Sequence, residues 1–212
     1  RGDIRFDDGV REGDTISPFY DSMVAKLIVH GDTREQALAR LDDALAQTHI
    51  VGLNTNVQFL RRVLATGSFA QARLDTALIT REHARLFEHP GVPAELALAA
   101  ATAQAWLDES GHGALNAAAW VDPWSCRDGF QAHGPGQRTW VWQVGEQRLG
   151  TLLGTGPHQS LAVGDGPALP FAAQRQGEQL DITWGEHRLR AHVHGWGEQV
   201  HVFLNDGALM VE

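Results

Sequence analysis

Turn signals recur about every ten residues through the second half of the chain, and this spacing limits the fold more than any other feature. Several pair a glycine with an acidic residue, as in Gly145-Glu146, Gly177-Glu178 and Gly185-Glu186. Between the turns, apolar and polar residues alternate with the period of a half-buried strand. This pattern predicts about eight short antiparallel strands in a barrel or a sandwich. They cover residues 139–144, 147–154, 158–163, 168–174, 180–184, 187–194, 199–204 and 207–211.

A long alanine-rich helix is expected directly before these strands. His89-Pro90-Gly91 marks a boundary, and Pro93 at the first helical position opens a helix over residues 93–110. Small side chains on its apolar face let neighbouring backbone approach closely, so we favour a barrel at 128–212 that curls around this helix. The face consists of Leu96, Ala99, Ala100, Ala103, Trp106 and Leu107.

The first 88 residues show a different pattern, in which short apolar strands alternate with helices. Asp32 at the N-cap and Glu35 at the N3 position predict a capping box, and a helix follows it. A second helix is expected over 57–64, closed by Gly67, and a third over 75–86. We therefore expect an α+β chain with a small domain at 1–88, followed by the helix and barrel at 89–212.

Charge and cysteine content exclude several classes of function. A formal net charge of −9 argues against nucleic acid and against an anionic membrane surface as partners. No apolar run is long enough for a membrane span. Cys126 is the only cysteine, which favours a reducing compartment, the cytoplasm. Arg1 stands where an initiator methionine would be, and we expect the sequence to be an excised piece of a longer protein.

Lys26 is the only lysine of the 212 residues. The chain therefore lacks a glycine-rich phosphate loop that ends in Lys-Ser/Thr, and it lacks a lysine in a tight turn that could carry a covalent cofactor. We expect no cofactor to be bound by this piece of the protein. Any nucleotide or carrier group belongs to another segment.

Residues 5–27, RFDDGVREGDTISPFYDSMVAKL, closely resemble the C-terminal part of biotin carboxylase. The match continues through Ile50 to Asn56 and Leu74-Asp75-Thr76. The resemblance implies that the region holding ATP, Mg²⁺ and bicarbonate lies upstream of this sequence. It also implies a biotin carrier domain downstream, with its lysine between two methionines, and predicts that this piece alone is inactive.

The second half resembles the domain that joins carboxylase to carrier in biotin-dependent acyl-CoA carboxylases. Residues 122–130, DPWSCRDGF, are similar to the start of that barrel in 3-methylcrotonyl-CoA carboxylase α subunits. The resemblance implies carboxyl transfer to 3-methylcrotonyl-CoA on a carboxyltransferase β subunit. The α subunit of a propionyl-, acetyl- or geranyl-CoA carboxylase remains an alternative, as does a non-enzymatic adaptor module.

Two kinds of site follow from the resemblance. Arg5 aligns with the arginine that faces the ureido oxygen of biotin, where a guanidinium stabilises the negative charge that develops on proton loss. Trp120, Asp122 and Trp124 lie in a long segment between helix and barrel, which in the family is a hook that reaches the β subunit. Aromatic anchors of this kind are enriched at interface centres. The alternative is that both tryptophans fold back and plug the barrel.

Three other groups of residues have a structural interpretation. Tyr20 is expected to pack, Asp21 to cap or pair, and Lys26 to face solvent from a strand. Tryptophans on alternating strand positions are more often core than a stacking platform for a ligand; these are Trp140, Trp142 and Trp184. Four histidines on two adjacent strands could bind Zn²⁺, but we expect exposed, metal-free side chains; these are His187, His192, His194 and His201.

Overall fold

The structure is a computed structural model, and it describes residues 4–17, 19, 23–88, 91–111, 136–156, 158–205 and 207–212. The chain divides into two compact units, Arg1–His89 and Pro90–Glu212. The first unit contains a small sheet and short helices, and the second contains a long helix and an eight-stranded sheet. The α+β class expected from the sequence is therefore confirmed.

The first unit contains a two-stranded antiparallel sheet in which Phe6 pairs with Leu27. Arginines join the helices that follow. Arg61, through Nε and Nη2, donates to both carboxylate oxygens of Asp42, at 2.8 and 3.3 Å. Its neighbour Arg62 donates to the Leu86 carbonyl at 2.8 Å. The elements are β1 (Ile4–Asp8), β2 (Ala25–Val29), α1 (Arg34–Ala46), α2 (Val57–Leu64), α3 (Gly67–Ala70), α4 (Leu78–Arg81) and α5 (His83–Phe87).

The start of α1 differs by one residue from the predicted capping box. Thr33, not Asp32, is the N-cap, and its hydroxyl oxygen accepts a hydrogen bond from the Gln36 backbone N–H at 3.3 Å. The Gln36 side chain in turn accepts from the Asp32 N–H at 3.2 Å. Thr33 and Gln36 satisfy the same spacing as Asp32 and Glu35, so the pattern alone could not choose between the two registers.

Two helix boundaries predicted from the sequence for the region after α2 were wrong. Gly67 begins α3 instead of closing α2, because Thr66 caps α3 by accepting from the Phe69 N–H at 3.3 Å. The single helix expected over 75–86 consists of two short helices, α4 and α5, that meet at Glu82. The expected helix 57–64 is confirmed as α2.

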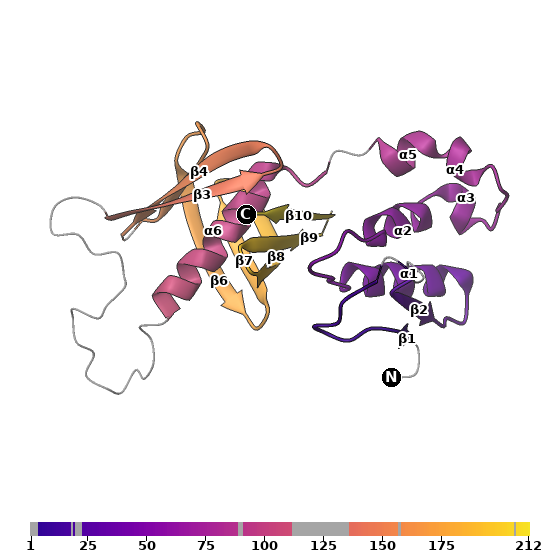
Figure 1. Ribbon diagram of the computed structural model, residues 1–212. Helices are drawn as coiled ribbons and strands as arrows, with labels where there is room; N and C mark the ends of the chain where they lie inside the picture. The colour runs from indigo at the N-terminus through magenta and orange to yellow at the C-terminus, as the bar shows by residue number, and fades with distance from the viewer. Residues whose placement is uncertain are drawn as a thin grey trace. The chain divides into compact units, whose positions relative to one another are not determined.

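The second unit is a meander in which every neighbour in the sheet is also a neighbour in sequence (Figure 1). All eight predicted strands are present. Glycines with φ between 57° and 64° turn five of the hairpin connections: Gly145, Gly164, Gly177, Gly185 and Gly197. The strands are β3 (Gly136–Val144), β4 (Gln147–Thr155), β5 (Ser160–Val163), β6 (Leu169–Gln176), β7 (Gln179–Trp184), β8 (His187–Trp196), β9 (Gln199–Leu204) and β10 (Gly207–Val211).

The sheet curls around α6 (Ala94–Gly111), as expected (Figure 1). The run Ala97–Ala101 is at most 1% exposed, and inward side chains such as Leu153 and Val202 are 0% exposed. The two ends of the sheet meet where Gln143 of β3 and Glu212 exchange two backbone hydrogen bonds of 2.5 and 3.0 Å. One detail differs: Pro93 is the residue before the helix, where its carbonyl accepts from the Ala97 N–H at 3.2 Å.

Three tryptophans on the strands belong to the core, as predicted. Trp142 and Trp184 are 8% and 7% exposed, and Trp140 is half-buried and packs against the core to which they belong. The Trp142 indole N–H donates to the Thr151 hydroxyl at 3.0 Å, and the Thr102 hydroxyl of α6 donates to the same oxygen at 2.9 Å. This buried network connects the helix to β3 and β4.

Candidate functional site

Arg5 lies on β1, on the same face of the small sheet as Asp7, Lys26 and Ile28. Its Nε donates to the Asp7 carboxylate at 2.6 Å, and its side chain is 73% exposed. This hydrogen bond lowers the pKa of Asp7 and raises that of Arg5. Lys26 is exposed, as expected. The face therefore presents a guanidinium whose direction is set by a neighbouring carboxylate.

The opposite face of the same sheet borders an apolar hollow of about 740 Å³. Phe6 and Leu27 line it from the sheet, and Leu41, Leu45 and Leu60 line it from α1 and α2. Arg5 lines neither this hollow nor the second one described below. Among the described residues, the sequence-predicted site is a single exposed arginine and not an enclosed pocket.

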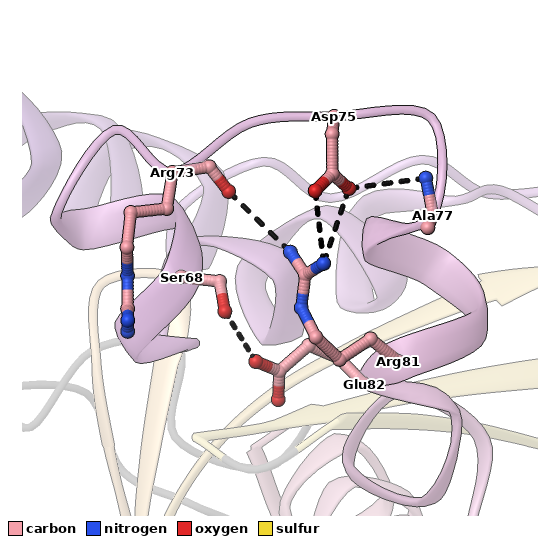
Figure 2. A network of polar contacts seen from close by, with 6 residues as sticks. All are labelled: Ser68, Arg73, Asp75, Ala77, Arg81 and Glu82. Atoms are coloured by element: carbon pink, nitrogen blue, oxygen red, sulfur yellow. Dashed lines mark hydrogen bonds and ion pairs between the residues drawn. The ribbon is translucent and has the colours of Figure 1, made fainter.

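The motif Leu74-Asp75-Thr76 has a structural role in the same unit (Figure 2). The Asp75 carboxylate accepts from the Ala77 N–H at 3.0 Å and from the Arg81 guanidinium at 3.0 and 3.2 Å. The hydrogen bond from Arg81 is the main cause that lowers the pKa of Asp75. Nearby, the Ser68 hydroxyl donates to Glu82 at 2.6 Å, which joins α3 to the junction of α4 and α5. The motif therefore holds short helices together.

The predicted partner-binding residues Trp120, Asp122 and Trp124 lie outside the described residues, as do Tyr20 and Asp21. The structure therefore does not test their roles. The role of Arg5 and the partner-binding role of Trp120, Asp122 and Trp124 both stay predictions.

The four histidines on β8 and β9 differ in exposure. His187 is exposed, but His192, His194 and His201 are half-buried, so the expectation that all four face water was wrong. His201 pairs directly with His194 across the strands, and the His194 ring meets Phe203 edge-on at 6.0 Å. Burial, followed by the His194 charge, lowers the pKa of His201. Among the described residues, no group of three or more His, Cys, Asp or Glu is arranged to hold a metal ion.

Sequence reasoning missed a polar hollow of about 520 Å³ on the outer face of β6, β7 and β8. Arg188 and Arg190 line it from β8, and Asp181 and Thr183 line it from β7. The alternation in His187-Arg188-Leu189-Arg190 places both arginines on one face, and this signal was available in the sequence.

Two family matches divide the chain in the same order as the two units. Residues 1–81 match the family described as "Biotin carboxylase C-terminal domain". Residues 93–212, more than half of the chain, match "Methylcrotonyl-CoA carboxylase, alpha-subunit, BT domain".

Individual relatives match part of the chain. Methylcrotonoyl-CoA carboxylase subunit alpha, mitochondrial, of Dictyostelium discoideum is 43% identical over 99 residues, which cover 46% of this chain and 14% of that protein. Biotin carboxylase of Halalkalibacterium halodurans is 44% identical over 77 residues, covering 36% of this chain and 17% of that one. Urea amidolyase of Saccharomyces cerevisiae is 39% identical over 75 residues, covering 35% and 4%. The chain thus spans a small part of the length of these relatives.

Among the described residues, no helix combines the length and the apolar character that a membrane crossing requires.

Proposed function

The chain belongs to the methylcrotonyl-CoA carboxylase alpha-subunit BT domain family, and we propose that it is a segment of the α subunit of a biotin-dependent acyl-CoA carboxylase. The observation that carries this proposal is the succession of two family matches in one chain, 1–81 and 93–212. A BT domain directly after a biotin carboxylase C-terminal domain is the order expected for a subunit that carboxylates biotin and passes the carboxyl group on. The same matches do not favour the adaptor module.

In this proposal the parent enzyme uses ATP, Mg²⁺, bicarbonate and biotin, and 3-methylcrotonyl-CoA accepts the carboxyl group on a β subunit. The residues that the structure describes do not fit the nucleotide or the metal. The only lysine lies exposed on β2, and the described residues hold no cluster suited to a metal ion. We assign these groups, and the biotinyl lysine, to other parts of the parent chain. The domains proposed for this segment are 1–88 and 89–212.

The assay that tests the proposal uses the full α subunit with its β subunit. ATP-dependent incorporation of labelled bicarbonate is measured with 3-methylcrotonyl-, propionyl-, acetyl- and geranyl-CoA. We expect the highest kcat/KM with 3-methylcrotonyl-CoA. A preference for another of the four acyl-CoAs would support the carboxylase activity but change the proposed substrate. No incorporation with any of them would overturn the proposal.

Within this enzyme, Arg5 is proposed to contact the ureido oxygen of biotin. Its exposure and its contact with Asp7 support a guanidinium that is held in position and open to a group brought from elsewhere. Arg5→Ala in the full subunit should slow biotin carboxylation by about 100-fold or more, with ATP binding unchanged. Arg11→Ala, an exposed arginine of the following loop, is the matched control. Wild-type carboxylation by Arg5→Ala, or a loss of subunit assembly in parallel with its activity, would show that Arg5 has no direct role in the reaction.

The contact with the carboxyltransferase β subunit is proposed to involve Trp120, Asp122 and Trp124. Substituting an aromatic anchor by alanine should cost roughly 2 kcal/mol or more of binding with little change in stability. Titration calorimetry of Trp120→Ala and Trp124→Ala against the β subunit, together with their melting temperatures, measures both quantities. Unchanged affinity with a large drop in melting temperature would identify the two residues as a plug of the barrel.

The parent protein is proposed to act in the cytoplasm, on the basis of the single cysteine of this segment, Cys126. Cell fractionation followed by blotting tests this location, and recovery of the protein in mitochondria would correct it.

A further inference from the structure

The polar hollow on the outer face of β6–β8 is built from two rows of side chains that run across the strands. In the first row, Ala172 pairs with Thr183, and Thr183 pairs with Arg188. Because alanine and threonine are short, this row leaves space beside the arginine. Together with a second row, described next, it borders a hollow of about 520 Å³, a volume in the range of small-ligand sites.

The second row supplies further polar groups at the same place. Gln174 pairs with Asp181, and Asp181 pairs with Arg190, while Asn205 lines the hollow from the end of β9. Arg190 Nε lies 3.6 Å from the Asp181 carboxylate, too far for a hydrogen bond, and its side chain is 73% exposed. Amide groups and a hydroxyl thus surround the cations.

The charges in this hollow do not balance. Arg188 is exposed and, among the described residues, forms no hydrogen bond or ion pair. Within the part of the chain that the structure describes, Arg190 has only the long contact with Asp181, which itself accepts a hydrogen bond from Gln179 at 2.9 Å. Two guanidinium groups therefore face one carboxylate, on a chain whose formal net charge is −9. A locally positive hollow on an acidic protein attracts an anionic group.

We propose that this hollow, the Arg188–Arg190 hollow, docks an extended acidic segment of a protein partner with carboxylates at alternate positions. Arg188 and Arg190 are two residues apart on one strand, so their Cα atoms are separated by about 7 Å. An extended segment with the pattern Glu-x-Glu presents carboxylates at the same spacing on one side. Each guanidinium can bind one carboxylate through two parallel hydrogen bonds. The proposal does not depend on the function proposed above.

The spacing favours two carboxylates over one phosphate. A single phosphate would have to draw both guanidinium groups together against their mutual repulsion, while Asp181 repels a dianion more strongly than it repels one carboxylate. The remaining groups fit a peptide as well. Gln174, Thr183 and Asn205 carry donors and acceptors that suit backbone amide and carbonyl groups.

The test titrates the 212-residue chain with the peptide Ac-Ala-Glu-Ala-Glu-Ala-NH2 and follows backbone and arginine side-chain resonances by NMR. We expect shifts that concentrate on β6, β7 and β8. Arg188→Gln combined with Arg190→Gln should weaken binding by at least about tenfold, because both bidentate contacts are lost. Asp181→Asn should strengthen it about two- to fivefold, because a competing surface ion pair is removed.

Matched controls separate this docking from general attraction of anions. Arg148→Gln changes an exposed arginine of β4 that does not line the hollow, and affinity should stay unchanged. The peptide with both glutamates replaced by glutamine should not bind. Shifts that survive in the Arg188→Gln, Arg190→Gln variant would overturn the proposal. So would an affinity for inorganic phosphate equal to that for the acidic peptide, or the absence of any shift at millimolar peptide.

Discussion

The two units of the chain bury their apolar residues to very different degrees. Among the described residues, the second unit contributes twenty buried hydrophobic side chains, and the first contributes three, Leu45, Leu78 and Leu86. Conversely, ten of the fourteen large hydrophobic residues that are exposed belong to the first unit. A sheet that curls around a helix covers the apolar side chains of both. A two-stranded sheet beside short helices covers only part of them.

The comparison indicates that the second unit has the core of an independent domain and that the first does not. An isolated two-stranded sheet is marginally stable in water, and it needs a further layer on its apolar face. The hollow of about 740 Å³ between β1–β2 and the helices of the first unit is what remains where such packing is missing. Four experiments test this difference, from the largest expected effect to the smallest.

Separating the units should produce the largest effect. We expect residues 90–212 alone to unfold in one cooperative transition, because their core is self-contained. Residues 1–89 alone should show no sharp transition and should bind a hydrophobic dye, because much apolar surface is exposed. Calorimetry and circular dichroism of both pieces and of the whole chain measure this. A sharp, cooperative melt of residues 1–89 would contradict the comparison.

Truncation of a leucine should be costly in the second unit and nearly neutral at an exposed position in the first. Leu153 is 0% exposed, and Leu153→Ala should lower the free energy of unfolding by about 2–5 kcal/mol. Leu74 is 54% exposed, and Leu74→Ala should change it by less than about 0.5 kcal/mol. Urea denaturation of the whole chain gives both values. Similar losses for the two variants would show that exposure does not distinguish the units.

Removal of the shared hydroxyl between α6 and the sheet should have an intermediate effect. Thr151→Val leaves the Trp142 N–H and the Thr102 hydroxyl buried without their acceptor, at a cost of about 1–3 kcal/mol. A double-mutant cycle with Thr102→Val measures the coupling directly. Thr139→Val, at an exposed position of β3, is the control. Additive losses in the cycle would mean that the contact between the two hydroxyls contributes nothing.

Mild acidification, from about pH 7 to about pH 5, should produce the smallest effect, and we expect it through His201 of the second unit. Since burial lowers the pKa of folded His201, the unfolded chain binds a proton at higher pH than the folded chain. The stabilising contribution of neutral His201 is thus complete above pH about 6.5 and declines as the pH falls below that value. His201→Gln should flatten this decline between pH 7 and 5 (about two pH units) in urea titrations. An unchanged slope in His201→Gln would contradict this origin.

The strands and the central helix could be predicted from sequence because each carries its own local signal. Gly145, Gly177 and Gly185 occupy a left-handed conformation that other residues rarely adopt, so they mark the turns independently of tertiary contacts. The alanines of α6 indicate close packing because their side chains are small. Local sequence was therefore sufficient to predict the turns and the central helix, where the properties of single residues determine the structure.

Prediction was weaker where neighbouring residues offer equivalent choices. Thr33 and Asp32 can both cap a helix, and only the contact with Gln36 decides between them. The break between α4 and α5 and the half-burial of His194 and His201 depend on packing across elements. The same holds for the Arg188–Arg190 hollow, which requires three strands in register. The sequence placed Arg5 on a strand, as the structure shows, but its role in biotin carboxylation came from the family resemblance and stays a prediction.

The uninterrupted meander of the second unit has a consequence for the order of folding. Every strand from β3 to β10 pairs with the next one in sequence, so each hairpin adds a short loop to what is already formed. α6 is synthesised before all of them and contains alanines that favour an early helix. The contact between Gln143 and Glu212 is the exception, because it joins opposite ends of the sheet. We expect its closure to be the slow step, with hydrogen exchange at Gln143 protected last during refolding.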